Sequence, residues 1–288
     1  MISEDAKAIL RTALAQHRDE QEMTGATLPL LSLARTRQLA KEAGCTILEV
    51  ELLALQMRVL PERYHRNFGT VGWDGQARLL QATVAVVGVG GLGGWVVETL
   101  ARMGIGHLIL IDGDRFEENN LNRQLGCTED TVGKPKVTCL AERVASVNGA
   151  VEVTPKETWL EEANAADLIA DADVVVDALD TVPARLQLQK VASACQIPLV
   201  HGAIAGYTGQ ITTVFPGDPG LEAIYGRQPT VERGVETELG NPSATPMMIS
   251  AWQSQEVVKI LLNQGELLRQ RMLLFDALAG DVTEIGLG

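Results

Sequence analysis

The strongest constraint on the fold of this chain is an apolar run that leads directly into a glycine-rich turn. Residues 84–87 read Val-Ala-Val-Val, which is typical of a buried strand, and residues 88–94 read Gly-Val-Gly-Gly-Leu-Gly-Gly. Residues 95–103 then favour a helix, and Gly104 is placed to end it. Such a turn lets the backbone approach a phosphate at a helix N-terminus. The pattern predicts a nucleotide-binding unit, with a glycine turn needed only for packing as the alternative.

Further strand and helix signals alternate along the chain. Strands are expected at 107–111, 151–153, 173–177 and 198–200, and helices near 135–147 and 248–262. Because alternating strands and helices form mainly parallel, doubly wound sheets, we expect a Rossmann-like α/β fold. An alternating run at 210–215 and a closing strand near 272–275 suggest antiparallel members in the C-terminal half.

Two segments differ from this pattern. Residues 1–60 predict a small helical N-terminal extension, followed by one α/β domain over residues 61–288. Residues 37–46 resemble a helix-turn-helix, but the next helix carries Glu49 and Glu51 where DNA binding needs basic or amide groups, so packing or a lid is favoured. Residues 216–246 are rich in glycine and proline and predict a lid or binding loop.

Charge and cysteine usage exclude several classes of protein. The formal net charge of -13 opposes general nucleic-acid binding, which needs a basic face. No apolar run is long enough for a membrane span, and the first residues lack the pattern of a signal peptide. Four scattered cysteines without a CxxC pair predict reduced thiols in a cytoplasmic protein and no zinc site.

Polar residues follow the predicted strands at the edge where α/β proteins bind ligands. Asp112 ends the second strand and is suitably placed for ribose hydroxyls. Arg123 and Lys136 could together neutralise a triphosphate, and Asp180, just after the strand at 173–177, could hold Mg²⁺. Each residue also has an ordinary interpretation, as a surface ion pair or a helix cap. Their shared position after successive strands makes the set stronger than its members.

These residues belong to six short motifs that resemble the HesA/MoeB/ThiF family in order and spacing. The motifs are RYHRN at 63–67, GVGGLGG at 88–94, LIDGD at 110–114, NNLNRQ at 119–124, VGKPK at 132–136 and VDALDT at 176–181. Members of this family are adenylyltransferases of sulfur-carrier proteins, related to ubiquitin-activating enzymes. The resemblance identifies residues 61–288 as an adenylating domain similar to theirs.

The resemblance implies a role for each matched residue. Gly88, Gly90, Gly91 and Gly93 would line the nucleotide, Asp112 would bind ribose, and Asn120, Arg123 and Lys136 would contact phosphates, assisted by Gln124. Asp180 would coordinate Mg²⁺ and act as the essential acid. Arg66 would reach the ATP of a neighbouring subunit, since family members are homodimers.

The resemblance also implies the reaction and the partner. A carboxylate would attack the α-phosphorus of ATP, release pyrophosphate and leave an acyl-adenylate. The acceptor would be a small ubiquitin-like sulfur carrier, whose Gly-Gly tail threads beneath residues 216–246. Many relatives carry two CxxC pairs for zinc and a cysteine in this loop, but no cysteine follows Cys195 here, so neither zinc nor a loop thioester is expected.

Three alternatives stay open. The carboxylate could be small or carried by a tRNA, as in the threonylcarbamoyladenosine dehydratases. A nicotinamide-dependent oxidoreductase would need only residues 88–112, but it would leave Arg123, Lys136 and Asp180 unexplained. A non-catalytic module that binds a carrier protein would tolerate loss of these three residues, yet all are present.

Overall fold

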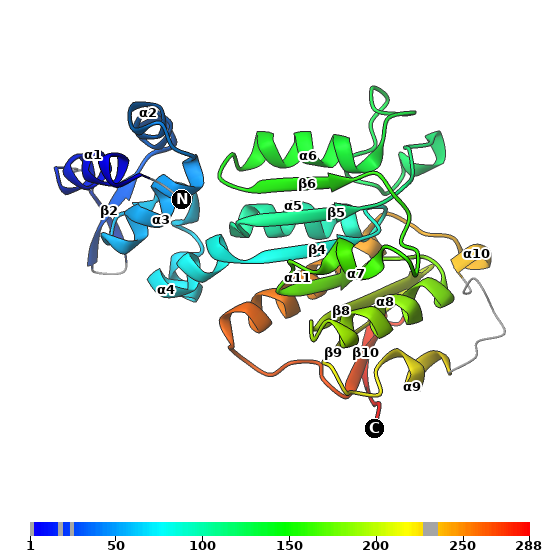
Figure 1. The fold of residues 1–288 in the computed structure, drawn as a ribbon. Coiled ribbons are helices and arrows are strands. Elements are labelled where there is room, and N and C mark those ends of the chain that lie inside the picture. The colour runs from blue at the N-terminus through cyan, green and yellow to red at the C-terminus, as the bar shows by residue number, and fades with distance from the viewer. Residues whose placement is uncertain (1–2, 17–19, 24–25, 227–235) are drawn as a thin grey trace.

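A computed structural model of the chain describes residues 3–16, 20–23, 26–226 and 236–288. Within this part of the chain, the largest element is an eight-stranded sheet in the order β11-β10-β9-β8-β7-β4-β5-β6 (Figure 1). Its strands are β4 (Thr83–Val87), β5 (His107–Ile111), β6 (Glu152–Lys156), β7 (Val174–Asp177), β8 (Leu199–Ala205), β9 (Thr208–Val214), β10 (Arg271–Asp276) and β11 (Asp281–Gly286). The five strands from β8 to β6 are parallel, and β9, β10 and β11 are antiparallel. The predicted doubly wound fold with antiparallel C-terminal strands is confirmed.

Helices cover both faces of the sheet (Figure 1). One face carries α4 (Phe68–Gln81), α5 (Gly93–Met103), α6 (Lys136–Val147) and α11 (Ala244–Leu262). The other carries α7 (Ala165–Ile169), α8 (Val182–Ala194) and α9 (Leu221–Tyr225). Successive side chains of β4 separate between these layers: Val84 and Val86 pack on the first face, and Ala85 and Val87 on the second. This two-sided burial explains why β4 is a continuous apolar run and not an alternating one.

The residues before the α/β domain form an N-terminal unit, which packs on α4 through an apolar cluster that includes Leu30, Leu55 and Leu80. It contains the expected helices, α1 (Glu4–Ala15), α2 (Leu33–Ala43) and α3 (Ile47–Gln56), which bury leucine and alanine side chains against one another. It also contains a three-stranded sheet that the sequence analysis did not predict, formed by β1 (Glu20–Met23), β2 (Ala26–Leu31) and β3 (Leu60–Pro61). The sheet joins segments distant in the sequence, because β2 pairs in parallel with β3.

The helix-turn-helix pattern at 37–46 corresponds to α2, a turn and α3. Gly44 ends α2 with φ 62°, and Thr46 and Glu49 form a reciprocal cap at the start of α3. Glu49 therefore caps the helix and Glu51 is fully buried, which supports the packing role over DNA binding.

The segment 216–246 contains α9 and α10 (Glu236–Leu239), while the rest of that predicted loop includes residues 227–235, which lie outside the described residues. Two 3₁₀ helices, η1 (Glu62–Tyr64) and η2 (Glu118–Asn120), complete the elements. Among the described residues, no helix has the length and apolarity to cross a membrane.

Candidate active site

The glycine turn joins β4 to α5 at the carboxyl end of the sheet. Gly88 has φ 82°, and a Cβ there would lie 2.6 Å from the carbonyl oxygen of Ala178. A Cβ on Gly93 would overlap the carbonyl oxygen of Gly88. Both positions therefore require glycine for the turn itself. No side chain caps the N-terminus of α5 at Leu92, which leaves that helix end suited to an anion.

A cavity of about 410 Å³ opens in front of this turn. Its floor is the edge where β4, β5 and β7 end together, since Val87 pairs with both Ile111 and Asp177. Eight of the predicted site residues line it: Gly88, Gly90, Gly91, Asp112, Arg123, Gln124, Lys136 and Asp180. Three do not, namely Arg66, Gly93 and Asn120.

Asp112 connects the second strand to the glycine turn. It is nearly buried, and its Oδ2 accepts the backbone N–H of Val89 at 2.8 Å while its Oδ1 accepts that of Asp114, also at 2.8 Å. Each carboxylate oxygen keeps a further lone pair for an outside donor. Asp112 thus fixes the turn and still presents acceptors to a ligand hydroxyl.

The two cations predicted to contact phosphates both line the cavity. The Lys136 Nζ lies 2.8 Å from Asp114 Oδ2, and the lysine side chain is nearly buried. Arg123 Nη1 donates to the carbonyl oxygen of Asn119 at 2.9 Å and to Asn122 Oδ1 at 2.8 Å. Burial lowers the pKa of the Arg123 guanidinium from its ordinary value, although arginine stays charged in proteins. Charges held in such a partly dry site act strongly on a bound anion.

The loop that carries Arg123 is shaped by Asn120. The Asn120 side chain is buried, and its Oδ1 accepts the backbone N–H of Glu117. The backbone carbonyl oxygen of Asn120 accepts from the backbone N–H groups of Arg123 and Gln124. Asn120 therefore lies behind the cavity wall and holds the loop. Gln124 itself reaches the wall, where its buried Oε1 has no hydrogen-bond partner among the described residues.

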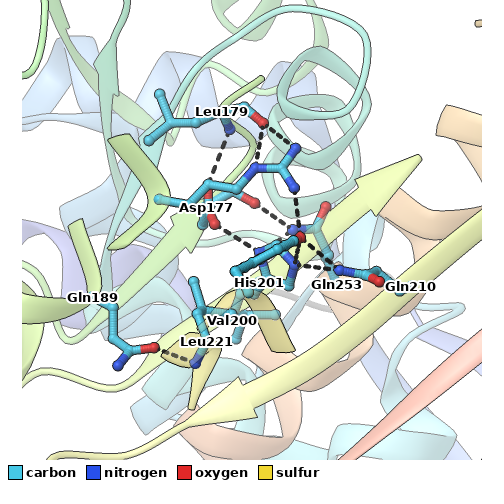
Figure 2. Close-up of polar contacts among 10 residues, drawn as sticks. Asp177, Leu179, Gln189, Val200, His201, Gln210, Leu221 and Gln253 are labelled. Atoms are coloured by element: carbon cyan, nitrogen blue, oxygen red, sulfur yellow. Dashed lines mark hydrogen bonds and ion pairs between the residues drawn. The ribbon is translucent and has the colours of Figure 1, made fainter. Parts of the chain in front are cut away.

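Asp180 lies exposed at the cavity rim, just past β7. Hydrogen bonds fix the turn at 178–180 that carries Asp180. Asp177 Oδ1 accepts the Leu179 N–H at 3.0 Å, and Arg185 donates twice to the Leu179 carbonyl oxygen, at 3.1 and 2.7 Å. Figure 2 shows these contacts around Asp177 and Leu179. The position of Asp180 thus depends on buried neighbours.

A buried polar network continues beneath Asp180, and sequence reasoning missed it. Asp177 Oδ2 lies 2.7 Å from His201 Nδ1, and both side chains are fully buried (Figure 2). On the other side of the imidazole, Tyr225 Oη lies 3.2 Å from His201 Nε2 and accepts from Arg185 at 2.8 Å and from Gln210 at 2.6 Å. Gln210 Nε2 lies 3.1 Å from the same imidazole nitrogen, so Tyr225 and Gln210 both face His201 Nε2.

The proton positions in this network follow from its donors. Burial lowers the pKa of His201, and Asp177 opposes this effect only in part, so the imidazole is neutral near pH 7. Its Nδ1–H donates to Asp177, and its Nε2 is then the acceptor that faces Gln210 and Tyr225. Only the spatial pairing of β7 with β8 brings Asp177 and His201 together, because their registers match. The sequence signal was a histidine directly after the strand predicted at 198–200, which the structure extends through His201 as part of β8.

A second cavity of about 330 Å³ adjoins the first. The two share Asp180, Arg185 and Ile204. Small residues form much of the second wall, including Ala203, Ala205 and Gly209. The pair of cavities thus leads from the glycine turn past Asp180 to the antiparallel strands β8 and β9.

Arg66 lies outside both cavities of its own chain. Its side chain is exposed, with no hydrogen bond or ion pair among the described residues. The segment that carries it is anchored: Tyr64 is fully buried and its Oη accepts from Asn148 Nδ2 at 3.0 Å, and Asn67 contacts Gln76 at 3.4 Å. Arg66 is therefore presented outward from a fixed base.

Two of the four cysteines are packed in the interior. Cys127 and Cys139 are buried beside Phe116, and burial raises the pKa of both thiols. Among the residues that the structure describes, no group of three or more histidine, cysteine and acidic side chains could hold a metal ion. Both observations agree with a packing role for these cysteines.

The fold and this cavity define the chain as a nucleotide-binding α/β protein with a ligand site at the carboxyl edge of its parallel strands. It belongs to the ThiF family, whose model matches residues 64–287. The family match begins after the N-terminal unit.

Relatives share most of this chain. The SAMP-activating enzyme E1 of Haloferax volcanii is 39% identical over 222 residues, which cover 75% of this chain and 82% of the relative. The molybdopterin-synthase adenylyltransferase of Escherichia coli is 34% identical over 234 residues, 78% of this chain and 92% of the relative. In contrast, the chain spans about half of a longer maize relative, the adenylyltransferase and sulfurtransferase MOCS3-2, at 35% identity over 78% of this chain and 48% of the relative.

Solved structures share the fold at lower identity. The E. coli MccB structure with ATP superposes with a TM-score of 0.67 at 23% identity and covers 78% of this chain and 72% of that chain. PaaA gives a TM-score of 0.67 at 24% identity over 78% and 73%. This likeness confirms the architecture alone.

Proposed function

We propose that this chain uses ATP to adenylate the C-terminal glycine carboxylate of a small ubiquitin-like sulfur-carrier protein, with release of pyrophosphate. The observation that carries the proposal is the gathering of the glycine turn, Asp112, Arg123 and Lys136 around one cavity. Membership of the ThiF family and the names of relatives that activate SAMP, molybdopterin synthase and sulfur carriers support the same activity.

The residues present fit an ATP molecule. The glycine turn at the uncapped start of α5 would receive phosphates, and Asp112 would accept from ribose hydroxyls. A Cβ on Gly90 would face Gln124 Nε2 at 3.5 Å, and one on Gly91 would face Arg123 Nε at 3.6 Å. Glycine at these two places therefore keeps open the space between the turn and the side chains opposite.

The reaction needs positioning and charge neutralisation more than a protein nucleophile. A carboxylate oxygen of the acceptor would form a bond to the α-phosphorus of ATP, and the bond from that phosphorus to the pyrophosphate oxygen would break. Arg123 and Lys136 would neutralise the charge that develops on the phosphoryl oxygens. Lys136 would exchange its ion pair with Asp114 for the phosphate.

Mg²⁺ fits the rim of the cavity. Asp180 is the exposed carboxylate there, and a protein commonly holds Mg²⁺ through one or two carboxylates together with substrate phosphates. Asp180 would thus share the ion with ATP. Such an ion would add positive charge beside the leaving pyrophosphate.

The partner surfaces follow from the same geometry. The second cavity, with its small-residue wall, would take the flexible Gly-Gly tail of the carrier up to Asp180. Arg66 points away from its own cavity, so it would complete the site of a second copy in a homodimer. With no cysteine after Cys195, sulfur would come from another protein.

The test is ATP–pyrophosphate exchange with purified candidate carriers that end in Gly-Gly, compared with tRNA and with no acceptor. We expect carrier-dependent exchange that falls at least about 100-fold in Asp180→Ala and in Arg123→Ala. The matched controls are Asp171→Ala and Arg102→Ala, which change exposed side chains outside the cavity and should keep exchange. Exchange that survives in both site variants, or that follows tRNA and not the carrier, would overturn the proposal.

A further inference from the structure

Trp159 is a large aromatic side chain left exposed in the wall of the first cavity. It follows β6, and 59% of its surface is accessible. Together with Thr158 and Leu160 it lines the cavity that also contains Asp112 and the glycine turn. An indole gains most from being covered, so a tryptophan held open at a cavity wall is suited to a planar ligand.

The indole lies beside the residue predicted to hold ribose. β6 is the neighbour of β5, and the Asp112 N–H donates to the Lys156 carbonyl oxygen at 3.2 Å, which brings the two strand ends together. A Cβ on Gly113 would lie 2.7 to 2.9 Å from three indole atoms of Trp159. Gly113 therefore leaves room for the indole directly behind Asp112.

The loop that carries Trp159 is fixed by Asn164. The Asn164 Nδ2 donates to the Trp159 carbonyl oxygen at 3.0 Å, and its Oδ1 accepts the Glu161 N–H at 2.8 Å. These bonds at both ends of one side chain close the loop before a ligand arrives. An aromatic wall that is already in place costs little conformational entropy on binding.

The geometry of a nucleotide then assigns the occupant. Phosphates at the glycine turn, Arg123 and Lys136 and a ribose at Asp112 leave the base on the far side of the ribose from the phosphates. Trp159 is placed to face the base, because its indole packs against Gly113, the residue directly after Asp112, and lines the same cavity. We infer that Trp159 stacks on the purine base of the nucleotide and is a nucleotide-binding residue for the proposed adenylation.

This inference rests on the proposed use of ATP but has its own readouts. Titration calorimetry with ATP and with inorganic tripolyphosphate separates base binding from phosphate binding. We expect Trp159→Ala to weaken ATP binding roughly tenfold and to leave tripolyphosphate binding unchanged, while Trp159→Phe keeps most of the ATP affinity. In exchange assays Trp159→Ala should raise KM for ATP more than it lowers kcat, because stacking holds the ground state and the transition state alike.

Tryptophan fluorescence gives a second measurement. ATP should quench the emission of the wild-type protein but not that of Trp159→Phe. The control is Trp252→Ala, because Trp252 packs on Phe275 outside both cavities; ATP should quench the emission of this variant as it does that of the wild type. The inference is overturned if Trp159→Ala binds ATP like the wild type, or if ATP and tripolyphosphate binding fall equally. Failure of the proposed function would look different: the wild-type protein itself would show no carrier-dependent exchange.

Discussion

At the scale of single residues, the two aspartates at the carboxyl end of β7 have separate tasks. Asp177 is fully buried, and its two carboxylate oxygens contact His201 and the Leu179 N–H. Asp180, three residues later, is exposed at the cavity rim. The first shapes the turn and the second lines the cavity, although both stand in the same short motif.

This division predicts effects of very different size for two alanine substitutions on stability. Asp177→Ala should lower the free energy of unfolding by about 3 kcal/mol, because it removes one member of a buried, hydrogen-bonded pair. Asp180→Ala should change it by less than about 0.5 kcal/mol, since an exposed carboxylate is replaced. Urea denaturation of the two variants measures both values. Equal stabilities would contradict the structural role of Asp177.

At the scale of elements, the strand–turn–helix unit depends on close backbone packing. The turn after β4 returns toward its own start, so that Gly93, the first residue of α5, lies against the Gly88 carbonyl oxygen. Gly88 also continues the sheet, because its N–H donates to the Ile111 carbonyl oxygen at 2.9 Å. The glycine turn and the sheet edge are therefore one rigid feature.

We expect Gly93→Ala to lower the free energy of unfolding by at least about 2 kcal/mol and to abolish ATP binding, because the added methyl group overlaps backbone that cannot move. The matched control is Gly69→Ala in α4, where a Cβ would meet no atom within 4 Å. That variant should be neutral or more stable by about 0.5 kcal/mol, since alanine favours a helix. Thermal unfolding and ATP titration test both. A fully stable Gly93→Ala protein would show that the turn relaxes.

At the scale of the whole molecule, a buried ion pair connects the N-terminal unit to the α/β domain. Glu51 of α3 is fully buried, and its Oε1 lies 3.1 Å from Arg63 Nε. Arg63 also contacts Asn148 Oδ1, and Asn148 Nδ2 donates to Tyr64 and to the Ala101 carbonyl oxygen. The contact joins the N-terminal unit to the ends of α5 and α6 through the segment that carries Arg66.

This contact predicts a pH-dependent stability. Burial raises the pKa of Glu51 from 4.5 to about 7, and it outweighs the opposing effect of Arg63 and the hydrogen bond with Tyr64. At pH values between 4.5 and about 7, Glu51 of the folded protein holds a proton that the same residue of the unfolded chain has released. The stability gained is complete below the unfolded pKa and is lost as the pH rises through 7.

Relative to Glu51→Gln, which cannot ionise, the wild-type protein should therefore lose about 2 kcal/mol of unfolding free energy between about pH 5 and about pH 8. Urea denaturation of both proteins across this range gives the difference, in which the other titrating groups cancel. Parallel pH profiles for the two proteins would rule out Glu51 as the titrating group.

The sequence by itself determined the parallel sheet, its antiparallel end and eight of the residues that line the cavity. These features are local: an apolar strand, a glycine turn and a polar residue at a strand end each leave a pattern within a few positions. Parallel strands then bring their carboxyl ends to one edge, so Asp112, Arg123, Lys136 and Asp180 gather without further information.

Only the tertiary structure decided what depends on contacts between distant segments. It placed Gly93 and Asn120 behind the cavity wall, paired β2 with β3, and buried His201 against Asp177. It also set Trp159 beside Asp112. Such contacts arise from the packing of whole elements, and the energy of a buried pair depends on partners far along the chain that no local pattern names.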